Sequence, residues 1–114
     1  AHDSLAEEKS GFLTAAIQLY ENLVAKNPKE IVFKQNLLQS YLRIRELNFD
    51  EKLFLVKIID NENVSTELKI ASYILLGQDL EAKKFLNKLI EEDRKKFKKY
   101  PIFNILELKR NILD

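Results

Sequence analysis

The chain has 114 residues, of which 19 are lysine or arginine and 18 are aspartate or glutamate, so its formal net charge is +1. This length suits a single domain with its own core, and the balanced charge does not indicate a nucleic acid partner. The absence of cysteine excludes disulfides, thiolate catalysis and thiolate-ligated zinc.

No apolar run reaches the roughly 18 residues that a membrane-spanning helix needs, and no signal peptide is visible. Because the chain does not begin with methionine, we expect it to be processed or part of a longer chain. Removal of a signal or anchor segment stays open, and the sequence leaves the compartment unknown.

The first predicted elements lie before Pro28. Only two glycines and two prolines interrupt the chain, which favours an all-α fold. Ser4 and Glu7 have the spacing of a capping box, so we expect a short helix over residues 5–10 that breaks at Gly11. One longer helix over 5–26 is the alternative. The next apolar stripe has the spacing of one helix face and consists of Leu13, Ala16, Ile17, Tyr20, Leu23 and Val24.

Two further helices are predicted between Asn27 and Asp60. Asn27 suits an N-cap and Pro28 a first helical position, which predicts a helix to about Arg45. Its expected buried face consists of Phe33, Leu37, Tyr41 and Ile44. Asn48 and Glu51 again have the spacing of a capping box. The helix that they begin is expected to bury Phe49, Leu53, Val56 and Ile59.

The remaining chain predicts three more helices. Ser65 or Thr66 caps a helix that ends at Gly77, a suitable glycine for the position after a helix. Asp79 begins the longest predicted helix, which runs to about Lys99, and Pro101 begins a last one. The inward residues expected in the Asp79 helix are Ala82, Phe85, Leu86, Leu89, Ile90 and Phe97. Short turns between the helices predict antiparallel neighbours.

The helices repeat one another with a period of about 33 residues. Tyr41 and Tyr73 are 32 residues apart, and Ala16 and Ala82 are 66 apart, or two steps of 33. This period and its residues resemble the tetratricopeptide repeat. The second half of that repeat is matched by Gly11, Leu13, Ala16, Tyr20 and Pro28, the first half by Leu37 and Tyr41, and a partial copy by Tyr73, Gly77 and Ala82.

The resemblance covers about residues 5–94 and has departures. Lys52 takes the alanine position of the middle repeat, and the third repeat lacks its proline. What the resemblance implies is one domain over 1–114, built as antiparallel helical hairpins stacked in a short tetratricopeptide-like α-solenoid of about six or seven helices. The implied repeats are 1–28, 29–63 and 64–100, followed by a terminal helix over 101–114.

Catalytic constellations are absent from the sequence. His2 is the only histidine and stands at a terminus, and no glycine-rich phosphate loop is present. We therefore expect no enzymatic activity, no cofactor, no metal and no small-molecule substrate.

The resemblance instead implies a protein–protein interaction or scaffolding module that binds a partner protein or peptide. In tetratricopeptide repeats the first helix of each hairpin lines the concave face. The corresponding positions of this chain are Gln35, Gln39, Arg43, Glu67 and Ala71. They do not reproduce the lysine and asparagine clamp by which some members hold chaperone C-termini.

A basic run near the C-terminus gives a second hypothesis, binding to an anionic surface such as acidic lipid or nucleic acid. It consists of Arg94, Lys95, Lys96, Lys98 and Lys99. Against this hypothesis, Glu91 and Glu92 stand four residues before Lys95 and Lys96, the order that favours ion pairs within a helix. We therefore do not expect nucleic acid or a membrane surface as the main partner.

The predicted terminal helix is more apolar than a one-sided surface helix requires. Phe103, Leu108 and Ile112 are the residues that would form an oligomer face. Packing against the preceding hairpin and association with another copy of the chain both stay open.

Overall fold

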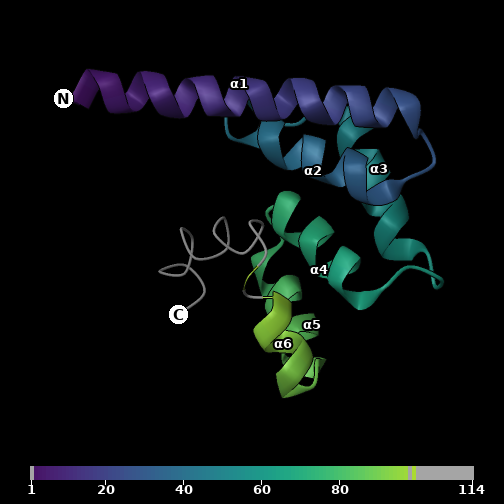
Figure 1. Ribbon diagram of the computed structural model, residues 1–114. Helices are drawn as coiled ribbons and strands as arrows, with labels where there is room; N and C mark the ends of the chain where they lie inside the picture. The colour runs from purple at the N-terminus through teal and green to yellow at the C-terminus, as the bar shows by residue number, and fades with distance from the viewer. Residues whose placement is uncertain (1, 98, 100–114) are drawn as a thin grey trace. The chain divides into compact units, whose positions relative to one another are not determined.

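The computed structural model describes the backbone of residues 2–97 and 99, and the side chains of residues 11–97 and 99. This part of the chain contains six helices and no strand (Figure 1), so the predicted all-α class is confirmed for it. The helices are α1 (His2–Lys26), α2 (Ile31–Leu42), α3 (Phe49–Asp60), α4 (Thr66–Leu75), α5 (Asp79–Lys88) and α6 (Glu91–Phe97).

The chain divides into two compact units, of which the first ends at Leu47 and the second begins at Asn48. The division falls inside the predicted repeat 29–63. The first unit contains α1 and α2, and the second contains α3 to α6.

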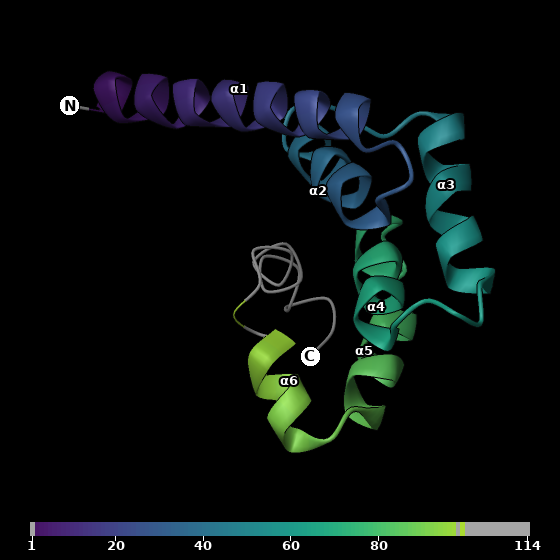
Figure 2. The ribbon, with the colours of Figure 1, turned by 45° about the vertical axis from the view of Figure 1, so that its right-hand side comes forward.

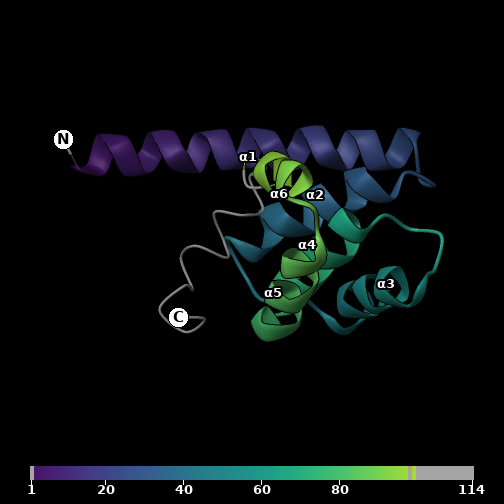
Figure 3. The ribbon, with the colours of Figure 1, turned by 90° about the horizontal axis from the view of Figure 1, so that it is seen from below.

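Helix α1 is a single helix of 25 residues (Figures 1 and 3), so the predicted break at Gly11 was wrong. A glycine inside a helix costs only about 0.5–1 kcal/mol relative to alanine, which the flanking helical residues offset. Gly11 does not have a positive φ, unlike Gly77.

Within the first unit, α2 packs against α1. It lies along the part of α1 that leads to Lys26, and the N-terminal turns of α1 extend past it (Figures 1 and 2). Leu37 and Leu38 of α2 are buried.

The boundaries of α2 differ from the prediction. Asn27 does not cap α2, because it ends α1: its backbone N–H and its side-chain Nδ2 both donate to the carbonyl oxygen of Leu23, at 2.9 and 3.1 Å. The N-cap of α2 is Glu30, which makes no side-chain cap hydrogen bond. At the other end the chain leaves the helix after Leu42, and Ile44 is 58% exposed rather than buried.

In the second unit, α3 begins with the predicted capping box. The Glu51 N–H donates to Oδ1 of Asn48, and the Asn48 N–H donates to Oε1 of Glu51, both at 2.8 Å. The predicted inner face was wrong, however. The buried residues of α3 are Leu55 and Ile58, whereas Phe49, Leu53 and Val56 are exposed.

Helix α4 packs between α3 and α5. The hydroxyl of Ser65 caps its start by accepting from the Leu68 N–H at 3.4 Å. At its end Gly77 has a φ of +76°, and two hydrogen bonds close the turn: Gln78 N–H to Tyr73 O at 2.9 Å and Gly77 N–H to Ile74 O at 3.0 Å. This pair of bonds is the Schellman motif, so the predicted terminal role of Gly77 is confirmed.

The predicted single helix from Asp79 to Lys99 was wrong, because two helices occupy the range. Leu89 ends α5 with an extended ψ of 146°, and α6 turns back (Figure 2). This turn leaves Phe97 only 1% exposed, while Ile90, which was expected to face inward, is 64% exposed. Ala82 and Leu86 are buried as predicted. The predicted helix from Pro101 lies outside the described residues.

Candidate interaction surfaces

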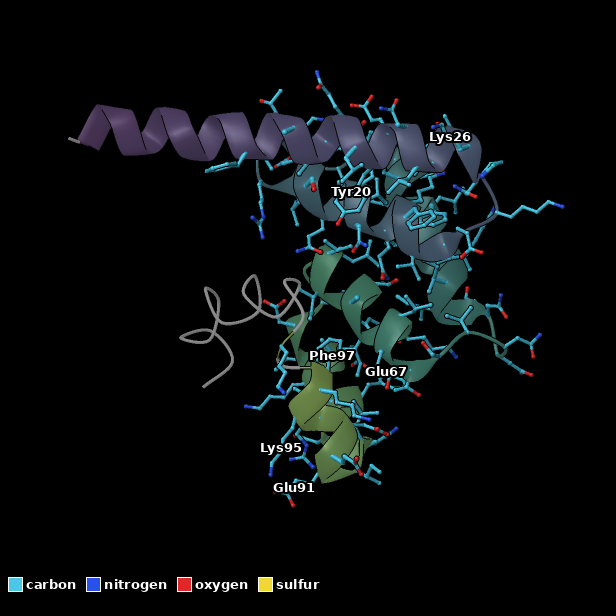
Figure 4. All side chains as sticks on the ribbon, viewed as in Figure 1. Tyr20, Lys26, Glu67, Glu91, Lys95 and Phe97 are labelled. Atoms are coloured by element: carbon cyan, nitrogen blue, oxygen red, sulfur yellow. The ribbon has the colours of Figure 1, made fainter. Side chains whose placement is uncertain are left out.

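The five predicted concave-face residues come from both units and differ in exposure. Gln35 and Gln39 on α2, and Ala71 on α4, are buried, with exposed fractions of 6%, 8% and 5%. Arg43 is exposed at the C-terminal end of α2, and Glu67 is half-buried in the first turn of α4 (Figure 4). Arg43 and Glu67 are therefore the members of this set whose side chains reach solvent.

The predicted basic run is described at Arg94, Lys95, Lys96 and Lys99, whereas Lys98 lies outside the described residues. Nζ of Lys95 lies 3.6 Å from Oε1 of Glu91 (Figure 4), and Nζ of Lys96 lies 3.9 Å from Oε1 of Glu92. Both pairs are the i,i+4 pairs that the sequence predicted.

Arg94 lies in α6, and its Nη2 donates to the carbonyl oxygen of Leu89, which ends α5, at 3.2 Å. Arg94, Lys95 and Lys96 thus each have a partner within five residues in the chain, although the buried Nε of Arg94 has none in the described structure. This arrangement is typical of a solvated helix end and offers an anion little unpaired charge.

The predicted oligomer face of Phe103, Leu108 and Ile112 lies outside the described residues. A different apolar surface is exposed on α3, and we call it the α3 outer face. It consists of Phe49, Leu53 and Val56, which are 76%, 39% and 39% exposed. Their spacing of four and three residues places them on one side of the helix, opposite Leu55 and Ile58, so α3 is apolar on two sides.

The sequence itself contains evidence that α3 is apolar on two sides. The spacing of Phe49, Leu53 and Val56 indicated a continuous apolar stripe, but periodicity alone assigned it to the core. The second apolar pair, Leu55 and Ile58, was the sign that α3 has two apolar faces, of which only one packs against α4.

Two polar groups of the second unit have unusual surroundings. Asp79 is buried, and its Oδ1 has no hydrogen-bond partner in the described structure. It is the first residue of α5, where the helix dipole favours a negative charge. Desolvation raises the pKa of the Tyr73 phenol above its ordinary value, and the carboxylates of Glu81 and Asp60 add to the increase. The Tyr73 ring stacks on Phe85 with 5.4 Å between centroids.

Among the described residues, no group of three or more acidic, histidine or cysteine side chains is arranged to hold a metal ion. None of the described helices is both long enough and apolar enough to cross a membrane.

Comparison of the chain with known proteins gives no match, whether to a family model, to a curated protein or to a solved structure.

Proposed function

We propose that the chain is a non-enzymatic protein–protein interaction module of tetratricopeptide-like type. The observation that carries this proposal is the hairpin of α4 and α5. Gly77 takes the left-handed conformation in its turn, and Ala82, which is 0% exposed, stands where the two helices meet. These are the glycine and alanine positions of the repeat that the chain resembles.

The same hairpin supports the repeat through its aromatic residues. Tyr73 on α4 stacks on Phe85 on α5, so an aromatic pair fills the space between the two helices. A small residue at a close helix–helix contact and an aromatic pair beside it are what a stacked hairpin needs. In the first unit α1 and α2 also pack against each other, joined by four residues, and in the proposed repeat they would be the second helix of one hairpin and the first helix of the next.

Exposed polar groups on the first helices of the hairpins are the proposed contacts for the partner. Arg43 and Glu67 carry opposite charges and reach solvent, so each can form a charge-assisted hydrogen bond with a peptide. Gln35, Gln39 and Ala71 act as supporting residues, because their side chains are buried.

The test begins with affinity capture on the immobilised chain, followed by titration of the captured protein by calorimetry. Arg43→Glu and Glu67→Lys should each weaken binding about thirtyfold or more, since truncating or reversing a paired charge at an interface costs roughly 2 kcal/mol or more. Lys29→Glu, at an exposed turn position, is the matched control and should leave the affinity unchanged. Absence of any protein partner, together with turnover of a metabolite, would contradict the proposal.

A further inference from the structure

We infer that the α3 outer face is the contact surface of a weak, antiparallel dimer between two copies of this chain. The starting observation is that Phe49 is 76% exposed at the first position of α3, in line with the exposed Leu53 and Val56. Helix α3 buries Leu55 and Ile58 on one side and exposes this apolar stripe on the other. The exposed stripe is therefore available for a contact with another molecule.

The apolar stripe is complementary to itself when two α3 helices run antiparallel. In such a pair, residues whose numbers add to a constant lie opposite each other. With a sum of 105 or 106, Phe49 lies opposite Val56 of the second copy, and Leu53 lies opposite Leu53. The largest side chain of the stripe thus meets the smallest, which lets the two helices interdigitate.

The charges beside the stripe favour nearly the same register. At about 100° per residue, Asp50 and Lys57 lie on one edge of the stripe and are about 10 Å apart along the helix. Their numbers add to 107, one or two above the sums of the stripe, so the antiparallel register places each Asp50 within about 3 Å, along the helix axis, of the position opposite Lys57 of the other copy. Both side chains are exposed, and within the described residues neither has an ion-pair partner.

Asp60 decides against the parallel arrangement. It stands one turn beyond Val56 on the same side of the helix, so two parallel helices would bring two Asp60 carboxylates together in the seam. In the antiparallel arrangement each Asp60 instead approaches the N-terminus of the partner's α3, where the helix dipole favours a negative charge.

Lys52 lies on the opposite edge and sets a limit on affinity, because the antiparallel register brings it near Lys52 of the second copy. The contact is also small beside the roughly 800 Å² per partner of a standard interface. We therefore expect dissociation in the range of about 10 μM to 1 mM.

The experiment uses sedimentation equilibrium of the full chain from low to high concentration, with each variant's fold checked by circular dichroism. The wild-type chain should be a monomer–dimer mixture, and Leu53→Asp should be monomeric at all concentrations. Asp50→Lys and Lys57→Asp should each weaken the dimer about fivefold or more, because two attractive pairs become repulsive.

Mixing the two single variants gives the decisive result. In the mixed dimer the introduced lysine of one chain faces the introduced aspartate of the other, and the native Lys57 of the first chain faces the native Asp50 of the second. Both attractive pairs are thus regained, so the mixed dimer should form more tightly than either variant does alone. Since each chain keeps its own folding defect in the mixture, a general loss of stability cannot imitate this recovery. Glu62→Lys, at an exposed loop position, is the charge control and should dimerise like the wild type.

A wild-type chain that stays monomeric at about 1 mM would overturn the inference and assign the α3 outer face to a different occupant. A mixture that binds no better than the separate variants would overturn it as well. Neither result bears on the partner-binding role proposed for Arg43 and Glu67.

Discussion

Helices α1 and α4 are both amphipathic, yet the chain buries them to different extents. Five of the ten residues of α4 are buried, and Ile70 and Ile74 are 0% exposed. In α1, which is 25 residues long, none of the described side chains from 11 to 26 is buried. The difference follows from the neighbours, because α4 packs between α3 and α5, whereas within its unit α1 packs against α2.

An apolar stripe is often taken to predict both that a helix forms and that the helix is buried. The comparison of α1 with α4 separates these two properties. The stripe of α1 is longer and more regular than that of α4, and it correctly indicates a helix. How deeply a stripe is buried depends on the number of helices that cover it, which is a property of the rest of the chain. The stability of the fold should therefore depend on α4 more than on α1.

The largest expected effect is at Ile74. Ile74→Ala removes a fully buried side chain between two helices and should lower the free energy of unfolding by about 2–5 kcal/mol. Leu23→Ala, on the half-buried stripe of α1, should cost about 1 kcal/mol, since less apolar surface is lost. Urea denaturation followed by circular dichroism measures both. Equal losses would show that α1 is buried as deeply in solution as α4.

The two glycines should respond to alanine in opposite directions. Gly77→Ala should destabilise the chain by about 1–2 kcal/mol, because alanine is strained at a φ of +76°. Gly11→Ala should stabilise it by about 0.5–1 kcal/mol, because it lies inside a helix. An added Cβ meets no atom within 4 Å at either position, so backbone conformation alone distinguishes them. A stabilising Gly77→Ala in thermal unfolding would refute this explanation.

The N-caps of α2 in the first unit and α3 in the second should also respond differently to substitution. Asn48→Ala removes the side-chain oxygen that caps α3 and should cost about 1 kcal/mol. Glu30→Asn adds a cap to α2, which has none, and should raise stability by about 0.5 kcal/mol. Thermal denaturation of both variants tests the pair. A neutral Asn48→Ala would mean that water replaces the cap at no cost.

The sequence predicted best those structural features that depend on residues close together in the chain. The cap at Asn48, the turn at Gly77 and the ion pairs of Lys95 and Lys96 each depend on contacts within five residues, so their spacing was sufficient. The all-α class followed for the same reason, since few breakers interrupt the helical pattern.

Tertiary packing explains the errors. No proline or glycine stands between Lys88 and Glu91, so nothing local predicted the break at Leu89. A straight helix over residues 79–97 would be about 28 Å long, whereas the ten residues of α4 span about 15 Å. The turn brings Phe97 back into a buried position that a straight helix could not reach. The outward orientation of Phe49, Leu53 and Val56 was likewise decided by the packing of α3 on α4.

Tertiary packing also decides which of the candidate site residues are buried, and the sequence did not predict it. Arg43 and Glu67, two of the predicted concave-face residues, reach solvent, but Gln35 and Gln39, which share their helical spacing with Arg43, are buried. Spacing places residues on one face of a helix without saying what lies over that face.

The smallest predicted effect concerns Tyr73, at the contact between α4 and α5. Desolvation raises its pKa above the unfolded value of 10.0, so the unfolded chain releases this proton first as the pH rises. The unfolded state then binds fewer protons than the folded state, and stability falls above about pH 10. Tyr73→Phe keeps the stacking on Phe85 but removes the ionisable group, so it should reduce this loss. The measurement is the difference in unfolding free energy between wild type and variant at about pH 8 and at about pH 10.5. A difference that stays constant with pH would show that the Tyr73 phenol is as well solvated in the folded chain as in the unfolded state.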